Sequence, residues 1–343
     1  MDDAGVIGLP PRAERQTRRP GARFWMSATL IVALGALPVM AGLAGQPFYV
    51  TMVSRIMIFG LAALGLNLIL GYGAMVSFGH ALYIGVGTYA VGILSFHGIG
   101  NGYVHVAAAL ATGAVLATVL GLVCLRASGV AFIMITLAFA QMFYFLAVSL
   151  KHYGGDEGYA IAARSDFGVL DLSDNTVLYY VIYAVLMLVL FLFHRLVHAR
   201  FGMVLRGCRE NERRMRAMGF PTLGYKLIAY VISALVCVLA GVLLANLTRF
   251  MSPSYMQWTV SGEILLMAVL GGVGTLLGPI VGSTIWLTLE ELLSSFALGL
   301  PWGMDELVRT HWLGVLGIVV ITVAVGLKEG VYGYFVARDE ASR

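Results

Sequence analysis

The sequence predicts an all-α integral membrane protein with about ten transmembrane helices, some of them broken or re-entrant. Of its 343 residues, 59% are hydrophobic and 12% are charged, whereas soluble domains carry about 25% charged residues. Apolar stretches of about twenty residues, the length that spans a bilayer as a helix, recur along the chain. The 42 glycines suit close packing of helices in lipid, where small residues let two backbones approach.

Ten stretches have the length and composition of spans. The first follows a basic stretch and lacks a small-residue cleavage motif at a suitable position, so we interpret it as a retained span rather than a signal peptide. The third and eighth border glycine-rich segments and are the two that best suit a broken or re-entrant path. The predicted spans are 25–45, 49–71, 74–97, 103–125, 128–150, 176–195, 226–248, 257–273, 279–298 and 311–328.

Positive charge predicts the orientation of these spans. Ten spans place both termini on one side of the membrane, and 17 of the 22 Lys and Arg residues fall on that side. The positive-inside rule therefore predicts cytoplasmic termini. The net charge of +4 arises from cytoplasmic segments and does not indicate nucleic-acid binding. The predicted organisation is a disordered basic tail over 1–24, a transmembrane domain over 25–328 and a second cytoplasmic tail over 329–343.

Two predicted loops are long. The external loop, residues 151–175, is net acidic, and its length suits a short helix or contact with a partner. The other, residues 196–226, is strongly basic: together with Arg195 it holds eight of the 22 Lys and Arg residues. A loop of this charge lies outside the hydrocarbon, and the positive-inside rule assigns it to the cytoplasm.

The basic loop contains a predicted helix over residues 209–214. Glu210 and Arg214 are four residues apart, a spacing that pairs them on one helix face. The helix is expected to end near Gly219, because Pro221 follows. A short amphipathic helix fits a groove of a partner protein. A solvated loop that only fixes the topology is an alternative of equal weight.

Polar residues at membrane depth are candidates for a translocation pathway, because polar groups in lipid are costly and mark either pathways or bonds between helices. One group follows the second predicted span, where glycines allow a broken helix whose free amides face a polar cavity. For each single residue the sequence favours helix packing, with Asn67 and Ser77 bonded across helices and His80 bonded to a carbonyl. The candidates of this group are Asn67, Tyr72, Ser77 and His80.

Further pathway candidates are Thr136 and Gln141 in the fifth span and Glu263 in the eighth. An acidic residue within a span is a functional candidate by default. Glu263 suits three roles: steering a substrate ammonium group, relaying protons or bracing a neighbouring helix. Of these we favour bracing. Four glycines between Glu263 and Pro279 predict a tight cytoplasmic turn between two spans.

The sequence contains no catalytic or metal-binding constellation. None of the three lysines follows a glycine, so the P-loop nucleotide-binding motif is absent. No Cys or acidic residue neighbours His80 with metal-ligand spacing, and the three cysteines form no disulfide framework. We therefore expect no catalytic residue, metal or cofactor in this chain.

Several segments resemble one family when they are taken together. The chain resembles the LivM-type permease subunits of bacterial ABC importers for branched-chain amino acids and related substrates. The resemblance covers roughly residues 54–291, and its segments occur in the family's order. They are Leu66–Ala81, Thr136–Ala140, Phe201–Glu212 with Met218–Phe220 and Tyr225–Leu227, and Glu263–Pro279.

The resemblance implies a multi-pass protein of the bacterial inner membrane, embedded in the lipid bilayer, that forms half of a translocation pathway. Its implied partners are a paralogous permease subunit, two cytoplasmic subunits that bind the ATP, and a periplasmic substrate-binding protein. It also makes the basic loop a coupling segment to the ATPases, which favours the docking helix over the solvated loop. The implied coupling residues are Arg206, Arg209, Glu210, Asn211, Glu212, Arg213 and Gly219.

Two segments depart from the family pattern, His152–Tyr159 in the external loop and Leu327–Gly330 after the last span. Relatives of the family serve branched-chain amino acids, urea, short amides and aromatic or other carboxylates, and the substrate lies within this range. The alternative functions are a stand-alone proton- or sodium-driven carrier that uses Glu263 and His80 as its relay, and a channel or scaffold subunit without a transport cycle.

Overall fold

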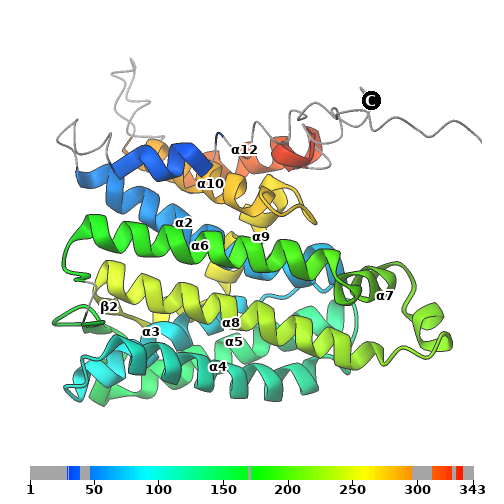
Figure 1. Ribbon diagram of the computed structural model, residues 1–343, viewed down its shortest axis with the longest axis horizontal. Coiled ribbons are helices and arrows are strands. Elements are labelled where there is room, and N and C mark those ends of the chain that lie inside the picture. The colour runs from blue at the N-terminus through cyan, green and yellow to red at the C-terminus, as the bar shows by residue number, and fades with distance from the viewer. Residues whose placement is uncertain are drawn as a thin grey trace, which may run out of the picture.

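The computed structural model describes residues 29, 31–38, 47–168, 171–295, 311–326 and 330–334, and most of them are helical (Figure 1). Among these residues, α2, α4, α5, α6 and α8 are long and apolar enough to cross a membrane. The all-α class is therefore confirmed. The helices are α2 (Pro47–Gly73), α3 (His80–Phe96), α4 (Gly102–Cys124), α5 (Val130–Ser149), α6 (Asn175–His198), α7 (Arg200–Ala217), α8 (Thr222–Thr248), α9 (Trp258–Gly271), α10 (Gly278–Ser294) and α12 (Trp312–Gly326).

Most predicted spans agree with these helices to within a few residues. The third is the exception, because it was expected to begin at residue 74 and α3 begins only at His80. The eighth agrees with α9 to within two residues, but α9 has only 14 residues. Of the first predicted span the structure describes residues 29 and 31–38, which are helical. The predicted tails 1–24 and 329–343 lie outside the described residues, except for the helical residues 330–334.

α2 lies at the centre of the described helices (Figure 1). It packs against α6, α8, α9 and α10, while α3 and α4 pack against α8. The sequence of α2 is apolar on nearly every side, which is the pattern of a buried helix. Accordingly 83% of its span is buried, compared with 22% of the span of α5. α5 instead exposes large apolar side chains such as Met134 and Phe145, as a lipid-facing helix does.

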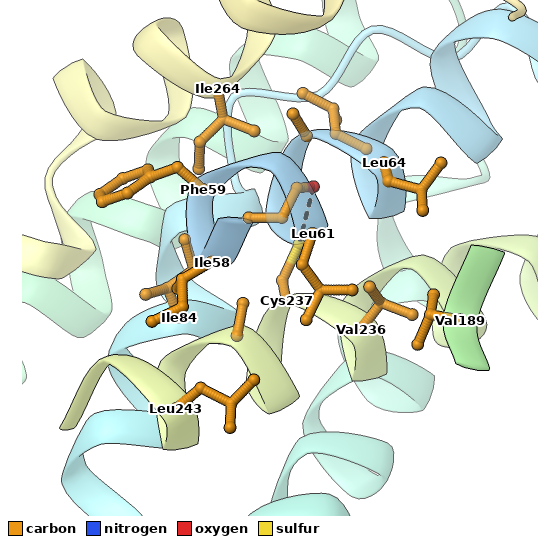
Figure 2. Close-up of a cluster of buried hydrophobic side chains, with 14 of the residues drawn as sticks. Ile58, Phe59, Leu61, Leu64, Ile84, Val189, Val236, Cys237, Leu243 and Ile264 are labelled. Atoms are coloured by element: carbon orange, nitrogen blue, oxygen red, sulfur yellow. Dashed lines mark hydrogen bonds between the residues drawn. The ribbon is translucent and has the colours of Figure 1, made fainter. Parts of the chain in front are cut away.

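The core around α2 combines large aliphatic side chains with small residues. Figure 2 shows Leu61 and Leu64 of α2 among side chains from the neighbouring helices. Ala62 and Ala63 of α2 are fully buried, and the Cys237 thiol lies 3.6 Å from the Ala62 carbonyl oxygen. In lipid such contacts stabilise helix pairs through van der Waals packing, because the bilayer is as apolar as the side chains.

The stretch between α2 and α3 is not helical, yet the Phe78 amide within it and the Ala81 amide at the start of α3 have side-chain partners. Ala74 adopts a φ of +52°, which ends α2. The Phe78 amide donates to the Thr136 hydroxyl at 3.2 Å, and the Ala81 amide donates to the Ser261 hydroxyl at 2.9 Å. A broken helix is tolerated in a membrane where neighbouring side chains satisfy its backbone in this way.

Short elements gather at the end of the bundle opposite α7 (Figure 1). β1 (Tyr159–Ala160) pairs antiparallel with β2 (Phe250–Met251). The 3₁₀ turns η1 (Lys151–Tyr153) and η2 (Pro253–Met256) lie beside them in the sequence. The predicted external loop is thereby joined to the connection between α8 and α9.

Candidate functional site

α7 carries the predicted coupling residues and is divided by a kink at Asn211. The Asn211 backbone leaves the helical region, with φ −157° and ψ 96°, and its side-chain oxygen accepts a hydrogen bond from the Arg214 amide at 3.0 Å. A side-chain oxygen bonded to the amide three residues later is an N-cap. Asn211 therefore starts a second, short helix that ends with α7 at Ala217.

This second helix ends close to the predicted residue. Gly219 has a φ of +85°, and its amide donates to the Arg216 carbonyl at 2.9 Å. The Phe220 amide donates to the Met215 carbonyl at 3.1 Å. These two bonds form a Schellman motif, which requires a left-handed residue and favours glycine. The predicted stop at Gly219 is confirmed.

The predicted pair of Glu210 and Arg214 does not form. The kink at Asn211 lies between these two residues, so they do not share one continuous helix face. An ion pair of the same four-residue spacing forms within the second helix instead, between Glu212 and Arg216 at 2.5 Å.

Glu212 anchors the second helix of α7 to the start of α8. It forms an ion pair with Lys226, and the Thr222 hydroxyl donates to it at 3.2 Å. Burial alone raises the pKa of Glu212, but hydrogen bonds and positive charge from Lys226 and Arg216 outweigh burial and hold this pKa below its ordinary value. Glu212 is therefore ionised near neutral pH, and its ion pairs persist there.

Arg209, in the first half of α7, contacts the end of α2. Its guanidinium donates a hydrogen bond to the carbonyl oxygen of Gly71. The same guanidinium lies beside Gly274, in the turn between α9 and α10. One side chain of the basic loop thus touches the ends of three membrane helices.

The turn between α9 and α10 is also bonded directly to α2. The Asn67 side chain donates to the Thr275 carbonyl at 2.7 Å and accepts from the Gly274 amide at 2.9 Å. A methyl group on Gly71 would lie 2.4 Å from the Gly274 nitrogen, so the close approach requires glycine. We call Asn67, Gly71, Arg209, Gly274 and Thr275 the Gly71 junction.

The remaining coupling candidates differ in their contacts. Arg206 donates to the Val197 carbonyl at 3.2 Å and so satisfies a carbonyl at the end of α6. Glu210 and Arg213 are exposed. Neither side chain has a hydrogen bond or ion pair within the described part of the chain, so both are open to a partner protein.

His80 lies fully buried at the start of α3, between two serine hydroxyls. Its Nδ1 is 3.0 Å from the Ser77 hydroxyl and its Nε2 is 2.9 Å from the Ser233 hydroxyl. Because the Ser233 hydroxyl donates to the Gly65 carbonyl at 2.6 Å, it accepts from Nε2–H. This places a proton on Nε2. The carbonyl partner expected for His80 is thus replaced by hydroxyls that join α2, α3 and α8.

The other pathway candidates do not meet at one place. Thr136 supports the break before α3, as described above. Tyr72 is buried within electrostatic reach of Arg206, and Gln141 is half-buried on α5. Glu263 is also half-buried and makes no hydrogen bond or ion pair with any described residue, so the bracing role that the sequence favours has no bond to support it.

A cavity of about 170 Å³ lies beside the first half of α7. Cys208 and Lys226 line it together with residues 73–76 and the connection between α4 and α5. None of the seven pathway candidates lines this cavity. Within the described residues, no three His, Cys, Asp or Glu side chains are placed to hold a metal ion.

Sequence reasoning missed four residues that shape these sites: Gly71, Lys226, Ser233 and Ser261. Lys226 was counted only as part of the positive charge of the basic loop. Gly71 stands in a glycine-rich stretch, and this composition was its one available signal. Serines within apolar spans are common, so nothing in the sequence distinguished the two that bond to the start of α3.

Comparison with known proteins gives one family match. Residues 48–327 match the family described as "Branched-chain amino acid transport system / permease component". No solved structure matches the chain.

The curated relatives are likewise permease proteins of branched-chain amino acid transport. The chain is 27% identical to the high-affinity branched-chain amino acid transport system permease protein LivM of Salmonella typhimurium, over 80% of this chain and 69% of the relative. It is 26% identical to the corresponding protein LivH of Escherichia coli, over 79% and 92%. A probable branched-chain amino acid transport permease protein LivM of Methanocaldococcus jannaschii is 27% identical over 80% and 91%.

Proposed function

Because the chain belongs to the family of permease components of branched-chain amino acid transport systems, we propose that it forms half of the translocation pathway of a bacterial ABC importer. The cargo is a branched-chain amino acid or a related small polar or carboxylate substrate, and partner subunits supply the energy by hydrolysing ATP. The observation that carries the coupling part of this proposal is the Gly71 junction, through which the basic loop reaches the ends of α2, α9 and α10.

The proposed topology has about ten spans with both termini in the cytoplasm of the inner membrane. α7 lies on the cytoplasmic side, because its exposed Arg200, Arg213 and Arg214 follow the positive-inside rule. The β1–β2 pair, at the other end of the bundle (Figure 1), then lies on the periplasmic side. There the loop over residues 151–175 is available to a substrate-binding protein.

Four kinds of partner complete the proposed importer: lipid, two ATP-binding subunits, a substrate-binding protein and a second, paralogous permease. Similarity to proteins named LivM and to proteins named LivH supports a pair of related permeases. The exposed side chains of Glu210 and Arg213, next to the kink at Asn211, are the proposed contacts with an ATPase. An importer of this kind is favoured by the family over a proton- or sodium-driven carrier that relies on Glu263 and His80.

The proposed coupling is mechanical. An ATPase that moves the second helix of α7 also moves α8, because Glu212 bonds to Lys226. The first half of α7 moves the ends of α2, α9 and α10, because Arg209 bonds to Gly71. Packed helices respond to such shifts as rigid bodies, and the tilt of the spans alternates access to the pathway.

Uncoupling of the purified complex tests this proposal. Deletion of residues 210–216, or Gly219→Pro, removes or misdirects the second helix of α7. Substrate-stimulated ATP hydrolysis is expected to fall at least tenfold in either variant, while the ATPase subunits alone keep their basal rate. Unchanged substrate-stimulated hydrolysis in both variants would overturn the coupling role of α7.

A further inference from the structure

Two charged side chains from two helices are in contact, and a third from a neighbouring helix lies within electrostatic range of both. Arg55 of α2 lies 3.4 Å from the Glu290 carboxylate of α10, and its guanidinium stands over the Phe59 ring at 5.7 Å from the ring centre. Glu263 of α9 is close enough to interact electrostatically with both Glu290 and Arg55. We call Arg55, Glu263 and Glu290 the charged triad.

The charged triad lies far from the Gly71 junction. Arg55 and Gly71 are 16 residues apart on the same helix, which is about 24 Å along the axis at 1.5 Å per residue. Glu263 is near the start of α9 and Glu290 near the end of α10, so all three charges are at the end of their helices that is remote from α7. In the proposed topology this is the periplasmic half of the membrane.

Among the described residues, the charges of the triad are not matched. Two carboxylates share one guanidinium, and the 3.4 Å contact between Arg55 and Glu290 is a loose pair. Glu263 forms no bond with a described residue. The side chains are also partly open, since Arg55 is 47% exposed and Glu290 is 24% exposed.

Such a cluster is not suited to a surface that faces lipid. Ionisable residues within spans face a bundle interior or a water-filled path, because exposure to hydrocarbon costs several kcal/mol. A long Arg side chain near a helix end escapes by reaching the interface, but the short side chains of Glu263 and Glu290 cannot reach as far. The triad therefore suits a water-filled path or contact with the cargo better than contact with lipid.

We propose that the charged triad is a binding site on the translocation pathway for the zwitterionic head of an α-amino acid. The ammonium group of the cargo sits between the carboxylates of Glu263 and Glu290. Its carboxylate takes the place of Glu290 beside the Arg55 guanidinium, which already has the planar donor geometry for a carboxylate. This inference rests on the proposed function and narrows its substrate: urea, amides and acids without an amino group lack one or both charges that the site recognises.

Uptake by the complete transporter in proteoliposomes tests the site. The probe is radiolabelled L-leucine, with the binding protein outside and ATP inside. ATP-dependent uptake by the wild-type complex tests the importer itself. Given that uptake, Glu263→Gln and Arg55→Gln are each expected to reduce the rate at least tenfold. The matched control is Glu291→Gln, the next residue on α10, and its rate should stay within twofold of wild type. Equal rates for Glu263→Gln and Glu291→Gln would overturn the site.

A labelling experiment keeps the inference testable if a charge variant assembles poorly. Single cysteines replace Glu263 or Glu290. The lipid-facing control is a cysteine in place of Phe145, which is 65% exposed and lies near the end of α5 that is periplasmic in the proposed topology. The native Cys124, Cys208 and Cys237 are buried. A membrane-impermeant thiol reagent should label positions 263 and 290 at least tenfold faster than 145, and leucine with its binding protein should slow this labelling at least threefold. Labelling at 263 as slow as at 145 would place the triad outside the pathway.

Discussion

Arg209 of the basic loop donates a hydrogen bond to the backbone carbonyl of Gly71, where α2 ends. Because α2 is the central and most buried of the long spans, this bond connects the surface segment that is proposed to meet an ATPase with the middle of the bundle. The acceptor is a backbone atom, so its position reports the position of α2 itself. Arg209 therefore connects α7 directly to the backbone of the core helix α2.

Arg209→Ala is expected to uncouple ATP use from transport. A hydrogen bond from a charged donor contributes about 1.5–3 kcal/mol, so its loss should lower the number of substrate molecules moved per ATP about tenfold or more. The measurement is the ratio of leucine uptake to phosphate release in proteoliposomes. The control is Arg200→Ala, an exposed arginine at the start of α7. An unchanged ratio in Arg209→Ala would show that the bond to Gly71 does not contribute to the coupling of ATP hydrolysis to transport.

Gly71→Ala is expected to destabilise the chain because the added methyl would lie 2.4 Å from the Gly274 nitrogen and 2.6 Å from its Cα atom. Backbone atoms cannot move aside as a flexible side chain does, and overpacking of this kind costs about 1–3 kcal/mol. Thermal unfolding in detergent measures the effect. Gly262→Ala is the matched control, since its methyl would meet only the Phe78 ring at 3.7 Å. Equal unfolding temperatures for the two variants would contradict the close contact at the junction.

The Glu212 anchor should make stability depend on acid pH. Folding lowers the pKa of Glu212 through Lys226 and Arg216, despite the opposing effect of burial. The stabilisation is then complete above the ordinary pKa near 4.5 and is lost as the pH falls through the lower folded value. The difference in unfolding temperature between wild type and Glu212→Gln should stay constant from pH 7 to pH 5 and shrink below about pH 4.5. A difference that grows on acidification would reverse the sign of the proposed shift.

His80 is expected to act as a structural residue. His80→Ala leaves the hydroxyls of Ser77 and Ser233 without their buried partner, and each such loss costs about 1–3 kcal/mol. The unfolding temperature should drop well below that of His198→Ala, a control at an exposed residue at the end of α6. ATP-driven uptake by wild type should also persist when a protonophore removes the proton gradient. Loss of uptake under that treatment would instead support a carrier in which His80 relays protons.

Regular features of the fold followed from the sequence because each has a local cause. Length and apolar composition predicted the spans, and the positions of Gly219 and Pro221 predicted where the second helix of α7 ends. The kink at Asn211 was not predicted, since an Asn within a helical charge pattern reads equally well as a helix residue. Because Asn211 caps the second helix through the Arg214 amide, the ion pair forms between Glu212 and Arg216 and not between Glu210 and Arg214 as predicted.

The contacts of the candidate sites could not be predicted, because they join residues far apart in the sequence. Asn67 was a pathway candidate, but only the fold brings it to Gly274 and Thr275. Likewise, no sequence pattern joins Arg55 and Glu290, which are 235 residues apart. Their meeting with Glu263 depends on how α2, α9 and α10 pack, and helix packing in lipid follows shape rather than a sequence pattern.

One uptake measurement tests most directly whether this chain is the permease half of an ATP-driven importer. The chain, tagged and purified in mild detergent with the proteins that remain bound to it, is reconstituted into proteoliposomes with its substrate-binding protein. We predict that leucine accumulates when ATP is enclosed and that imposed proton or sodium gradients without ATP give no accumulation. Accumulation driven by a gradient in the absence of ATP would contradict the account and identify a stand-alone carrier.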